Sequence, residues 1–543
     1  MSQEESLIQT SSVSLGAHLQ NSPSSRPKEI KPWVLLVCGD FGYVSQQPQF
    51  ISSGTIQDFL KSCNVEIKGR VAQGLPEFIE PFTVLSNIVA LSDFSEELIL
   101  QNCQTTKSLI DAKAIVDSVA KQQVSSSDAA TKIRALELAS PLKQQIVIAL
   151  SAEVKPQSTP QNSGSFADSI MSMIDTGTPQ TSPLEQLINV LGDDSNNPGY
   201  RINQLSKVQL LLADTIDKTA AALRSSSHYS TIASSWYALR NLLKKMGRSK
   251  LFEVYLYSSA SDNAFEHYQS ALGSLVNDGN APDIVLLSYE NNHLDIDTLD
   301  TLHKTAAIAD AARSMVWTSL AQDDLYFERI VSVETIGDHQ TIDAAIDCLR
   351  NESAARSIAL CGPSLHISSA KDNLIAGGAW ILADHWVSTF LSTGSPFDMT
   401  SLTTSELIDD QLMQQIPPHR IREIAKAGFT FVRIRNGRII IAPSVMLNAS
   451  GNERYASIGF NMLLNRSIRH AEHFIAVDGI GMTPETLASS LEQHLIKQLE
   501  PYGVISPLNA LTVTLNGKEL SIALNSQSVI DGNSIQFDFS FDI

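Results

Sequence analysis

Residues 511–543 alternate apolar and polar residues around a turn signal, and this pattern constrains the fold more than any other in the sequence. Residues 511–515 (LTVTL) and 520–524 (LSIAL) flank Asn516-Gly517, a pair typical of a two-residue β-hairpin. Residues 535–543 (IQFDFSFDI) add a third strand, whose apolar side chains point to one face because successive side chains on a strand alternate. The pattern predicts a hairpin followed by a strand that needs a sheet to join.

The first thirty residues form a polar segment with a weaker strand signal. Val13 and Leu15 alternate with serines, which favours a short strand in an otherwise extended arm. A strand with unpaired backbone groups at a protein surface is a site for pairing with another chain. Two interpretations of the end segments are therefore open: they complete sheets of neighbouring copies and so link subunits, or they complete the sheet of their own chain.

The central part of the chain alternates short apolar runs with stretches of helical periodicity, as proteins with both helices and strands do. Strands are predicted at residues 33–38, 65–71, 251–257, 284–287 and 315–318. Helices are predicted at residues 55–63, 205–223, 231–245, 264–276, 299–312, 454–477 and 484–499, and residues 95–152 are largely helical. The predicted fold class is mixed α/β (α+β), with mixed sheets flanked by helices and extended strands at both ends.

A change in composition marks the predicted domain boundary. Residues 156–164 (PQSTPQNSG) have no apolar periodicity and are typical of a solvated linker. A short amphipathic segment, Phe166–Ile174, follows the linker. We expect five parts: an N-terminal arm with its strand (1–30), a small α/β domain with helices (31–155), the linker with the amphipathic segment (156–200), a larger α/β domain (201–510) and the C-terminal hairpin and strand (511–543).

Acidic residues outnumber basic ones by 58 to 39, which gives a net charge of −19. This charge repels nucleic-acid phosphates and anionic lipids, so we expect neither as a partner. The longest apolar stretch, residues 374–383, is well short of the roughly twenty residues that cross a bilayer, and the first thirty residues lack the features of a secretory signal. We expect a cytoplasmic protein, not embedded in a membrane, whose cysteines are reduced core residues: Cys38, Cys63, Cys103, Cys348 and Cys361.

The sequence lacks the common motifs for catalysis and cofactor binding. Neither a GxxxxGK[ST] nor a GxGxxG loop occurs, and the turn at residues 39–42 has a carboxylate where a phosphate would lie. Residues 362–366 (GPSLH) bring a serine near a histidine without a GxSxG elbow. We interpret both segments as ordinary loops, and we predict no enzymatic activity, no cofactor and no metal site.

Three further sets of residues have structural explanations that we favour. His470 and His473 share a helix face and could bind a metal, but no third ligand is evident, so we predict a solvent-facing pair. Asp295 and Asp297 precede a helix, where capping explains them. Four tryptophans in apolar contexts are predicted to lie in the core: Trp236, Trp317, Trp380 and Trp386.

Residues 215–243 resemble the large sheath subunit of type VI secretion systems. In that family an Ile-Asp pair opens a helix, a histidine and an aromatic residue follow, and Ser-Trp-x-x-Leu leads into an apolar pair. This chain has the same order: Ile216-Asp217, His228-Tyr229, Ser235-Trp236, Leu239 and Leu242-Leu243.

Further stretches resemble the family and occur in the same order along the chain, at residues 283–290, 349–354, 454–476 and the closing β segment. Residues 34–42, 56–71 and 91–99 look like the small sheath subunit, which is normally a separate chain.

The resemblance implies a contractile tail-sheath protein in which the two subunits are fused. Such a sheath forms a helical homopolymer around an inner tube protein, joins a baseplate, and contracts to propel the tube and its spike for effector delivery. In the family, strands from the small subunit's N-terminus and the large subunit's C-terminus link neighbouring subunits. The matching residues here are Val13, Leu15, Leu511, Val513, Leu515, Ile535, Phe537, Phe539 and Phe541.

The amphipathic segment Phe166–Ile174 resembles the part of the large subunit that a recycling AAA+ ATPase, an unfoldase, recognises after contraction. Its apolar stripe comprises Phe166, Ile170, Met173 and Ile174. A helix packed on its own domain would show the same stripe, so both interpretations are open.

Some positions depart from the family pattern. Tyr237 stands where the family usually has arginine, and Ser288 where it has aspartate, so charged contacts of relatives do not carry over at these positions.

Two alternative functions are open. One is the sheath of a phage tail or an extracellular contractile injection particle, which shares the fold and the linking strands. The more distant one is a soluble α/β enzyme.

Overall fold

The computed structural model of the protein describes residues 31–76, 79–151, 198–259, 264–288, 295–320, 340–366, 374–404, 418–435, 438–448 and 456–542. The chain divides into two compact units. The first comprises residues 1–56, 235–369 and 375–543, and the second comprises residues 57–234 and 370–374. Among the described residues, none of the helices has both the length and the apolar content needed to cross a bilayer.

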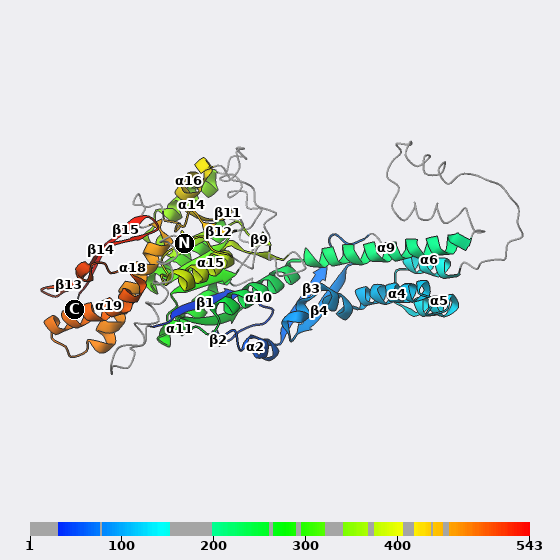
Figure 1. The fold of residues 1–543 in the computed structure, drawn as a ribbon, viewed down its shortest axis with the longest axis horizontal. Coiled ribbons are helices and arrows are strands. Elements are labelled where there is room, and N and C mark those ends of the chain that lie inside the picture. The colour runs from blue at the N-terminus through cyan, green and yellow to red at the C-terminus, as the bar shows by residue number, and fades with distance from the viewer. Residues whose placement is uncertain are drawn as a thin grey trace, which may run out of the picture. The chain divides into compact units, whose positions relative to one another are not determined.

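The first unit is built on an eight-stranded mixed sheet with the order β12-β11-β8-β7-β6-β1-β5-β2. Figure 1 labels β1, β2, β11 and β12 of this sheet. Its six inner strands are parallel, and the edge strands β2 and β12 are antiparallel to their neighbours. β1 lies between β5 and β6, so a strand from the start of the described chain joins strands that come much later. The strands are β1 (Trp33–Gly39), β2 (Gln49–Ile51), β5 (Phe252–Ser258), β6 (Ile284–Ser288), β7 (Met315–Ser319), β8 (Ile358–Gly362), β11 (Phe429–Arg435) and β12 (Arg438–Ile441).

Helices cover both faces of this sheet, which explains why its inner strands are nearly continuous apolar runs. On one face, Leu36 and Cys38 of β1 belong to a buried cluster with residues of α11 (Ala264–Asn277), α12 (Ile296–Ala311), α14 (Gln340–Arg350) and α16 (Pro418–Lys426). The other face packs on α15 (Gly378–Thr393), where Trp386 meets Trp33 and Trp317 edge-on. Smaller elements complete this part: η3 (Ser353–Ser357), β9 (Leu365–His366) and β10 (Ile375–Ala376).

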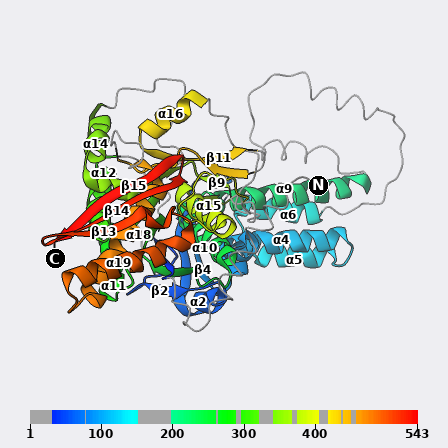
Figure 2. The same ribbon diagram turned by 60° about the vertical axis from the view of Figure 1, so that its left-hand side comes forward.

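The C-terminal part of the first unit joins two helices to a three-stranded antiparallel sheet (Figure 2). In sequence order it contains α18 (Ile458–His473), η4 (Phe474–Asp478), α19 (Pro484–Leu499), η5 (Glu500–Tyr502), η6 (Leu508–Ala510), β13 (Leu511–Asn516), β14 (Glu519–Ile530) and β15 (Asn533–Asp542). Both helices begin at side-chain caps, with Ser457 accepting from Phe460 N and Thr483 accepting from Thr486 N.

The second unit combines a two-stranded sheet with a group of helices. β3 (Val65–Val71) and β4 (Phe82–Ile88) pair antiparallel and alternate buried and exposed residues. The phenol of Tyr229 donates to the Phe94 carbonyl at 2.8 Å inside this unit. Two helices cross the boundary between the units: α2 (Ile56–Cys63), whose first residue belongs to the first unit, and α10 (Ser227–Met246), which belongs to the first unit from Ser235 onward. The other helices of the second unit are η1 (Leu91–Phe94), α3 (Glu96–Asn102), α4 (Gln104–Ala120), α5 (Ser126–Ala135), α6 (Ser140–Ser151) and α9 (Pro198–Arg224).

Several sequence predictions can be compared with this fold. The mixed α/β class is confirmed, with parallel and antiparallel strands in one sheet. Asp295 caps α12 as expected, accepting a hydrogen bond from Thr298 N at 2.7 Å. The four tryptophans predicted to be core residues are at most 1% exposed. The predicted domain boundaries stay a prediction.

Two expectations were wrong. Of the two histidines predicted to face solvent, His473 is exposed, but His470 is 6% exposed and its ring centroid lies 5.9 Å from that of His494 in α19. The helix of His470 is buried on most sides, which the spacing of two histidines does not reveal. The cysteines are not all core residues either, because Cys348 is exposed and Cys63 is half-buried.

Candidate inter-subunit linking site

Two tight turns connect the three strands of the C-terminal sheet. Asn516 pairs with Glu519 across Gly517-Lys518, and Gly517 adopts a positive φ of 69°, which suits the first position of a two-residue hairpin loop. The second turn, Asp531-Gly532, has positive φ values at both residues, 49° and 81°, as an Asp-Gly hairpin turn requires. A register shift between Asn525 and Val529 interrupts the β14–β15 pairing.

The apolar face of β15 becomes less buried toward its end. Ile535 and Phe537 are 1% and 3% exposed, whereas Phe539 and Phe541 are half-buried. Phe537 meets Phe460 of α18 with ring centroids 6.1 Å apart, and Phe539 stacks on Phe537 at 5.9 Å. The first half of β15 is therefore part of the core, and the second half extends past it.

β15 is an edge strand, and the turn register shows which of its backbone groups face outward. Two-residue loops close on a hydrogen-bonded pair, and such pairs then alternate along an antiparallel ladder. Counting from Asn516 and Glu519, the pairs of β14 with Phe537, Phe539 and Phe541 are hydrogen-bonded. The N–H and C=O groups of the alternate residues face away from β14: Asp538, Ser540 and Asp542. Within the described chain, no strand pairs with this outer edge.

The opposite edge of the sheet is partly occupied. By the same count, Val513 of β13 points its N–H away from β14, and this N–H donates to Glu492 Oε2 of α19 at 3.0 Å. α19 therefore covers the β13 edge, and β15 is left as the edge that can accept a further strand.

The β14–β15 turn is anchored to the body through a buried carboxylate. Asp531 accepts hydrogen bonds from Ser457 Oγ at 2.6 Å and from Met399 N at 3.2 Å. Burial raises its pKa to about 6, helped by the nearby charge of Asp398 and opposed by these hydrogen bonds. Next to it the chain is tightly packed, since a Cβ added to Gly459 would lie 2.0 Å from the Phe397 carbonyl oxygen.

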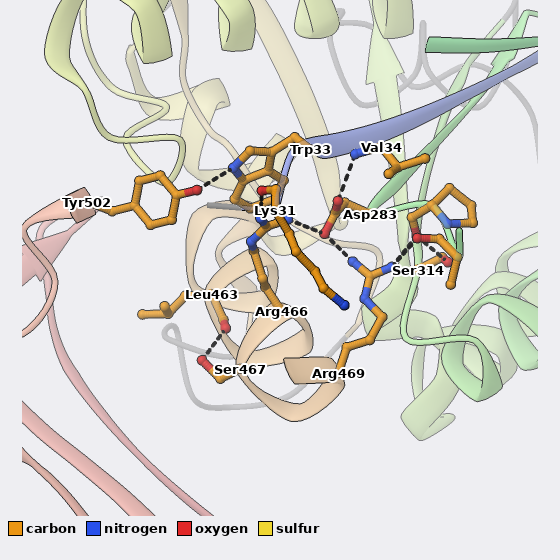
Figure 3. Close-up of polar contacts among 12 residues, drawn as sticks. Lys31, Trp33, Val34, Asp283, Ser314, Leu463, Arg466, Ser467, Arg469 and Tyr502 are labelled. Atoms are coloured by element: carbon orange, nitrogen blue, oxygen red, sulfur yellow. Dashed lines mark hydrogen bonds and ion pairs between the residues drawn. The ribbon is translucent and has the colours of Figure 1, made fainter. Parts of the chain in front are cut away.

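The N-terminal end of the described chain is held by a second cluster (Figure 3). Asp283 accepts from Val34 N at 2.8 Å, from Arg466 Nη1 at 2.9 Å, and from Arg469 Nη2. Arg466 also donates through Nη2 to the Lys31 carbonyl at 2.6 Å, and its guanidinium lies 4.1 Å from the Trp33 ring centroid. A buried carboxylate thus fixes two arginines, and one of them fixes the point where the N-terminal segment joins β1.

Positive charge accumulates around this cluster. Partial burial lowers the pKa of Lys31, and the charges of Arg466 and Arg469 lower it further. Burial, followed by the same two arginines, lowers the pKa of His470 well below its ordinary value. A cavity of about 500 Å³ lies beside these side chains and also borders Glu253, Glu472 and His473.

The structure places the predicted linking residues as follows. Seven of them lie in the C-terminal sheet: Leu511, Val513, Leu515, Ile535, Phe537, Phe539 and Phe541. Val13 and Leu15 lie outside the described residues, as do the residues expected to bind a recycling ATPase: Phe166, Ile170, Met173 and Ile174. β15 pairs with β14 of its own chain on one side, and on the other side none of the strands that the structure describes pairs with it.

Sequence reasoning missed the residues that anchor both segments. Arg466 and Arg469 are spaced like surface charges on a helix, and Asp531 has the composition of an exposed turn. No group of three or more His, Cys, Asp or Glu side chains among the described residues is arranged to hold a metal ion. The features of this site are backbone edges of the C-terminal sheet and the buried side chains that anchor it.

Comparisons with known proteins give only distant structural similarities. No protein-family model and no curated protein sequence matches the chain. The helical sheath of the anti-feeding prophage in its contracted state aligns at 10% identity with a TM-score of 0.36, over 57% of this chain and 79% of that one. The PVC sheath complex of an extracellular contractile injection system, also contracted, aligns at 10% identity and 0.35, over 57% and 77%.

A third similarity is shorter. The sheath tail protein from Desulfitobacterium hafniense aligns at 13% identity with a TM-score of 0.32, over 53% of this chain. The alignment covers 62% of that protein, which is less than two thirds of its length. TM-scores this low do not establish a common fold.

Proposed function

We propose that the chain is a structural subunit of a contractile sheath of the type VI secretion kind, and not an enzyme. Copies polymerise around an inner tube protein on a baseplate, in the cytoplasm, and the sheath contracts to propel the tube. Residues 31–155 act as the small-subunit-like part and residues 201–510 as the large-subunit-like part. The order of motifs along the sequence supports this assignment, and fusion keeps two parts that must pair one to one at high effective concentration.

The observation that carries the proposal is the outer edge of β15, with which no strand of the described residues pairs. Its outward N–H and C=O groups belong to exposed residues, and the aromatic side chains beside them are half-buried. An edge of this kind is what strand addition by another chain requires, because main-chain hydrogen bonds supply affinity and alternate side chains supply specificity. In the sheath, the N-terminal strand containing Val13 and Leu15 and the C-terminal sheet link neighbouring copies.

A proline on the outer edge tests this role without disturbing the sheet itself. Ser540 directs its N–H away from β14, so Ser540→Pro removes no hydrogen bond to β14 and blocks a partner strand. Ser540→Ala is the matched control. Deleting residues 535–543 is a poorer test, because it would also remove the buried Ile535 and Phe537.

The assay is negative-stain imaging of each purified protein, alone and with the inner-tube protein. We expect tubes from the wild type and from Ser540→Ala, and folded monomers without tubes from Ser540→Pro. Tubes of normal length from Ser540→Pro would refute the linking role of β15. A wild-type protein that stays a discrete particle with its inner-tube partner would refute the sheath function.

The amphipathic segment 166–174 is proposed as the recognition site of a recycling AAA+ ATPase. An intact, uncontracted sheath must protect such a segment, because an unfoldase that engaged it earlier would dismantle the tube. A peptide of residues 160–178 should bind the cognate ATPase in a pull-down. A peptide with Phe166 and Ile170 changed to serine is the matched control, and equal binding of both peptides would contradict this assignment.

A further inference from the structure

Helix α18 is buried on almost every side. Thirteen of its sixteen residues are buried, including Arg466 and His470. A helix that only covers a surface has one apolar stripe and an opposite polar face. α18 instead packs between several elements, and its two halves contact different parts of the first unit.

The first half of α18 holds the C-terminal sheet. Its cap Ser457 donates to Asp531 at the β14–β15 turn, and Phe460 meets Phe537 of β15. The Cβ position of Gly459 lies 2.8 Å from Ile530 Cγ2, so the helix backbone and the end of β14 are in direct contact. Only glycine permits this approach.

The second half of α18 holds the start of β1. Arg466 and Arg469 both bind Asp283, and Arg466 also binds the Lys31 carbonyl and covers the Trp33 ring. Six residues, or one and two-thirds turns, separate Phe460 from Arg466, so the two side chains leave the helix on different sides. The cap Ser457 and Arg466 are nine residues apart, which is roughly 14 Å along the helix axis.

A second contact joins the same two parts. Trp33 Nε1 donates to the Tyr502 hydroxyl at 3.2 Å, and the two rings lie 6.2 Å apart. Tyr502 ends η5, and the carbonyl of the next residue, Gly503, accepts a hydrogen bond from Ser528 Oγ of β14 at 2.9 Å. The start of β1 and the base of the sheet are therefore tied together both directly and through α18.

We infer that α18 mechanically couples the N-terminal segment to the C-terminal sheet, with Arg466 as the positioning residue that fixes the chain at Lys31. This inference rests on the proposed function for its purpose, since tension on one linking segment would pass through α18 to the other. The coupling itself can be tested on the monomer, without forming the polymer. Loss of Arg466 loosens the sheet at the other end of the helix, because the Lys31 carbonyl loses its donor on α18 and Asp283 keeps only one of its two arginines, Arg469.

The test is hydrogen–deuterium exchange on the full-length monomer, comparing wild type with Arg466→Met. We expect exchange in peptides covering residues 519–542 to rise at least tenfold in the variant. Arg356→Met is the matched control, because Arg356 of η3 also binds an aspartate, Asp310 of α12, at 3.0 Å in the same unit, and neither residue belongs to α18. It should leave exchange in residues 519–542 unchanged.

The possible results separate the inference from its alternatives. Increased exchange confined to the neighbourhood of Lys31 and Asp283 would overturn the coupling, and so would an equal increase caused by Arg356→Met, which would mean general destabilisation. If Arg466→Met does not fold, Arg466→Lys takes its place, since one ammonium group cannot replace both the bond to Asp283 and the bond to the Lys31 carbonyl, and the same criteria apply.

A polymerisation assay then tests the purpose of the coupling. Arg466→Met should give fewer and shorter tubes than Arg356→Met at a temperature where both monomers are folded. If exchange shows the coupling but the wild type forms no tubes, the proposed function fails and the coupling stands. If the wild type forms tubes but exchange at residues 519–542 does not respond to Arg466→Met, the coupling fails and the proposed function stands.

Discussion

The buried carboxyl of Asp531 makes the stability of the C-terminal anchor depend on pH. Its pKa is raised from 3.8 to about 6, mainly by burial, so the folded chain holds the proton more tightly than the unfolded chain does. The resulting stabilisation is fully present below about pH 4 and is lost as the pH rises through 6. A difference of about two pKa units corresponds to about 3 kcal/mol of unfolding free energy.

Asp531→Asn removes this dependence, because the amide is neutral throughout. Asparagine also tolerates the positive φ of this position. The difference in unfolding free energy between wild type and variant should therefore fall as the pH rises, by about 1.4 kcal/mol between pH 5 and pH 7.5. Taking the difference between two proteins cancels the titration of the other groups, Asp398 included, provided that the substitution does not move them.

Urea unfolding of both proteins at half-unit pH steps measures this difference. Low micromolar protein is needed at the acidic end, because the sequence pI is about 5.0. Ser457→Ala provides a second check: it removes a hydrogen bond that stabilises the carboxylate, so the midpoint of the pH dependence should move above 6. A difference between wild type and Asp531→Asn that does not change with pH would refute the reasoning.

Two further predictions concern the core contacts of the linking segments. Phe537→Ala should lower the unfolding free energy by about 3–5 kcal/mol, because the ring is 3% exposed. Phe541→Ala, at the half-buried end of β15, should lower it by less than half as much. Similar losses of unfolding free energy for the two variants in urea would contradict the gradient of burial along β15. Asp283→Asn should cost about 3–5 kcal/mol, because it leaves Arg466 buried without a countercharge. A simultaneous Arg466→Met change should then restore part of that loss, and strictly additive losses would argue against an interaction between the two side chains.

Local patterns were enough to predict some of the elements of this fold, but not β4, β8, β11, β12 or α15. The strand at 33–38, the helix at 55–63 and the hairpin at 511–524 each have a short-range signal, namely an apolar run, a 3.6-residue period or an Asn-Gly turn, and the structure contains all three. The hairpin loop is displaced by one residue, to Gly517-Lys518. Such a displacement is expected, because the positive φ of glycine fixes where the chain turns more firmly than Asn516 does.

The arrangement of the elements could not be predicted in the same way. The apolar run of β1 indicates only that the strand is buried on both faces. Its place between β5 and β6 depends on which helices cover those faces, and the run does not encode this. Asp531 reads as an exposed turn residue, because its burial depends on Met399 and Ser457, which are distant in sequence. The burial and pairing of Arg466 could not be predicted either, because its partner Asp283 lies 183 residues away in the sequence.

The charges on the outer edge of β15 also restrict which strand can pair with it. Asp538 and Asp542 lie on either side of Ser540, so two β15 edges pairing antiparallel about Ser540 would set carboxylates opposite one another. Like charges directly opposite each other destabilise a strand pair, and this repulsion protects an exposed edge from association with identical edges. Residues 6–25, which include Val13 and Leu15, contain no charged side chain apart from a titratable His18. The proposed linkage therefore pairs the C-terminal edge of one copy with the N-terminal segment of another, since that pairing avoids the repulsion that a symmetric contact would impose.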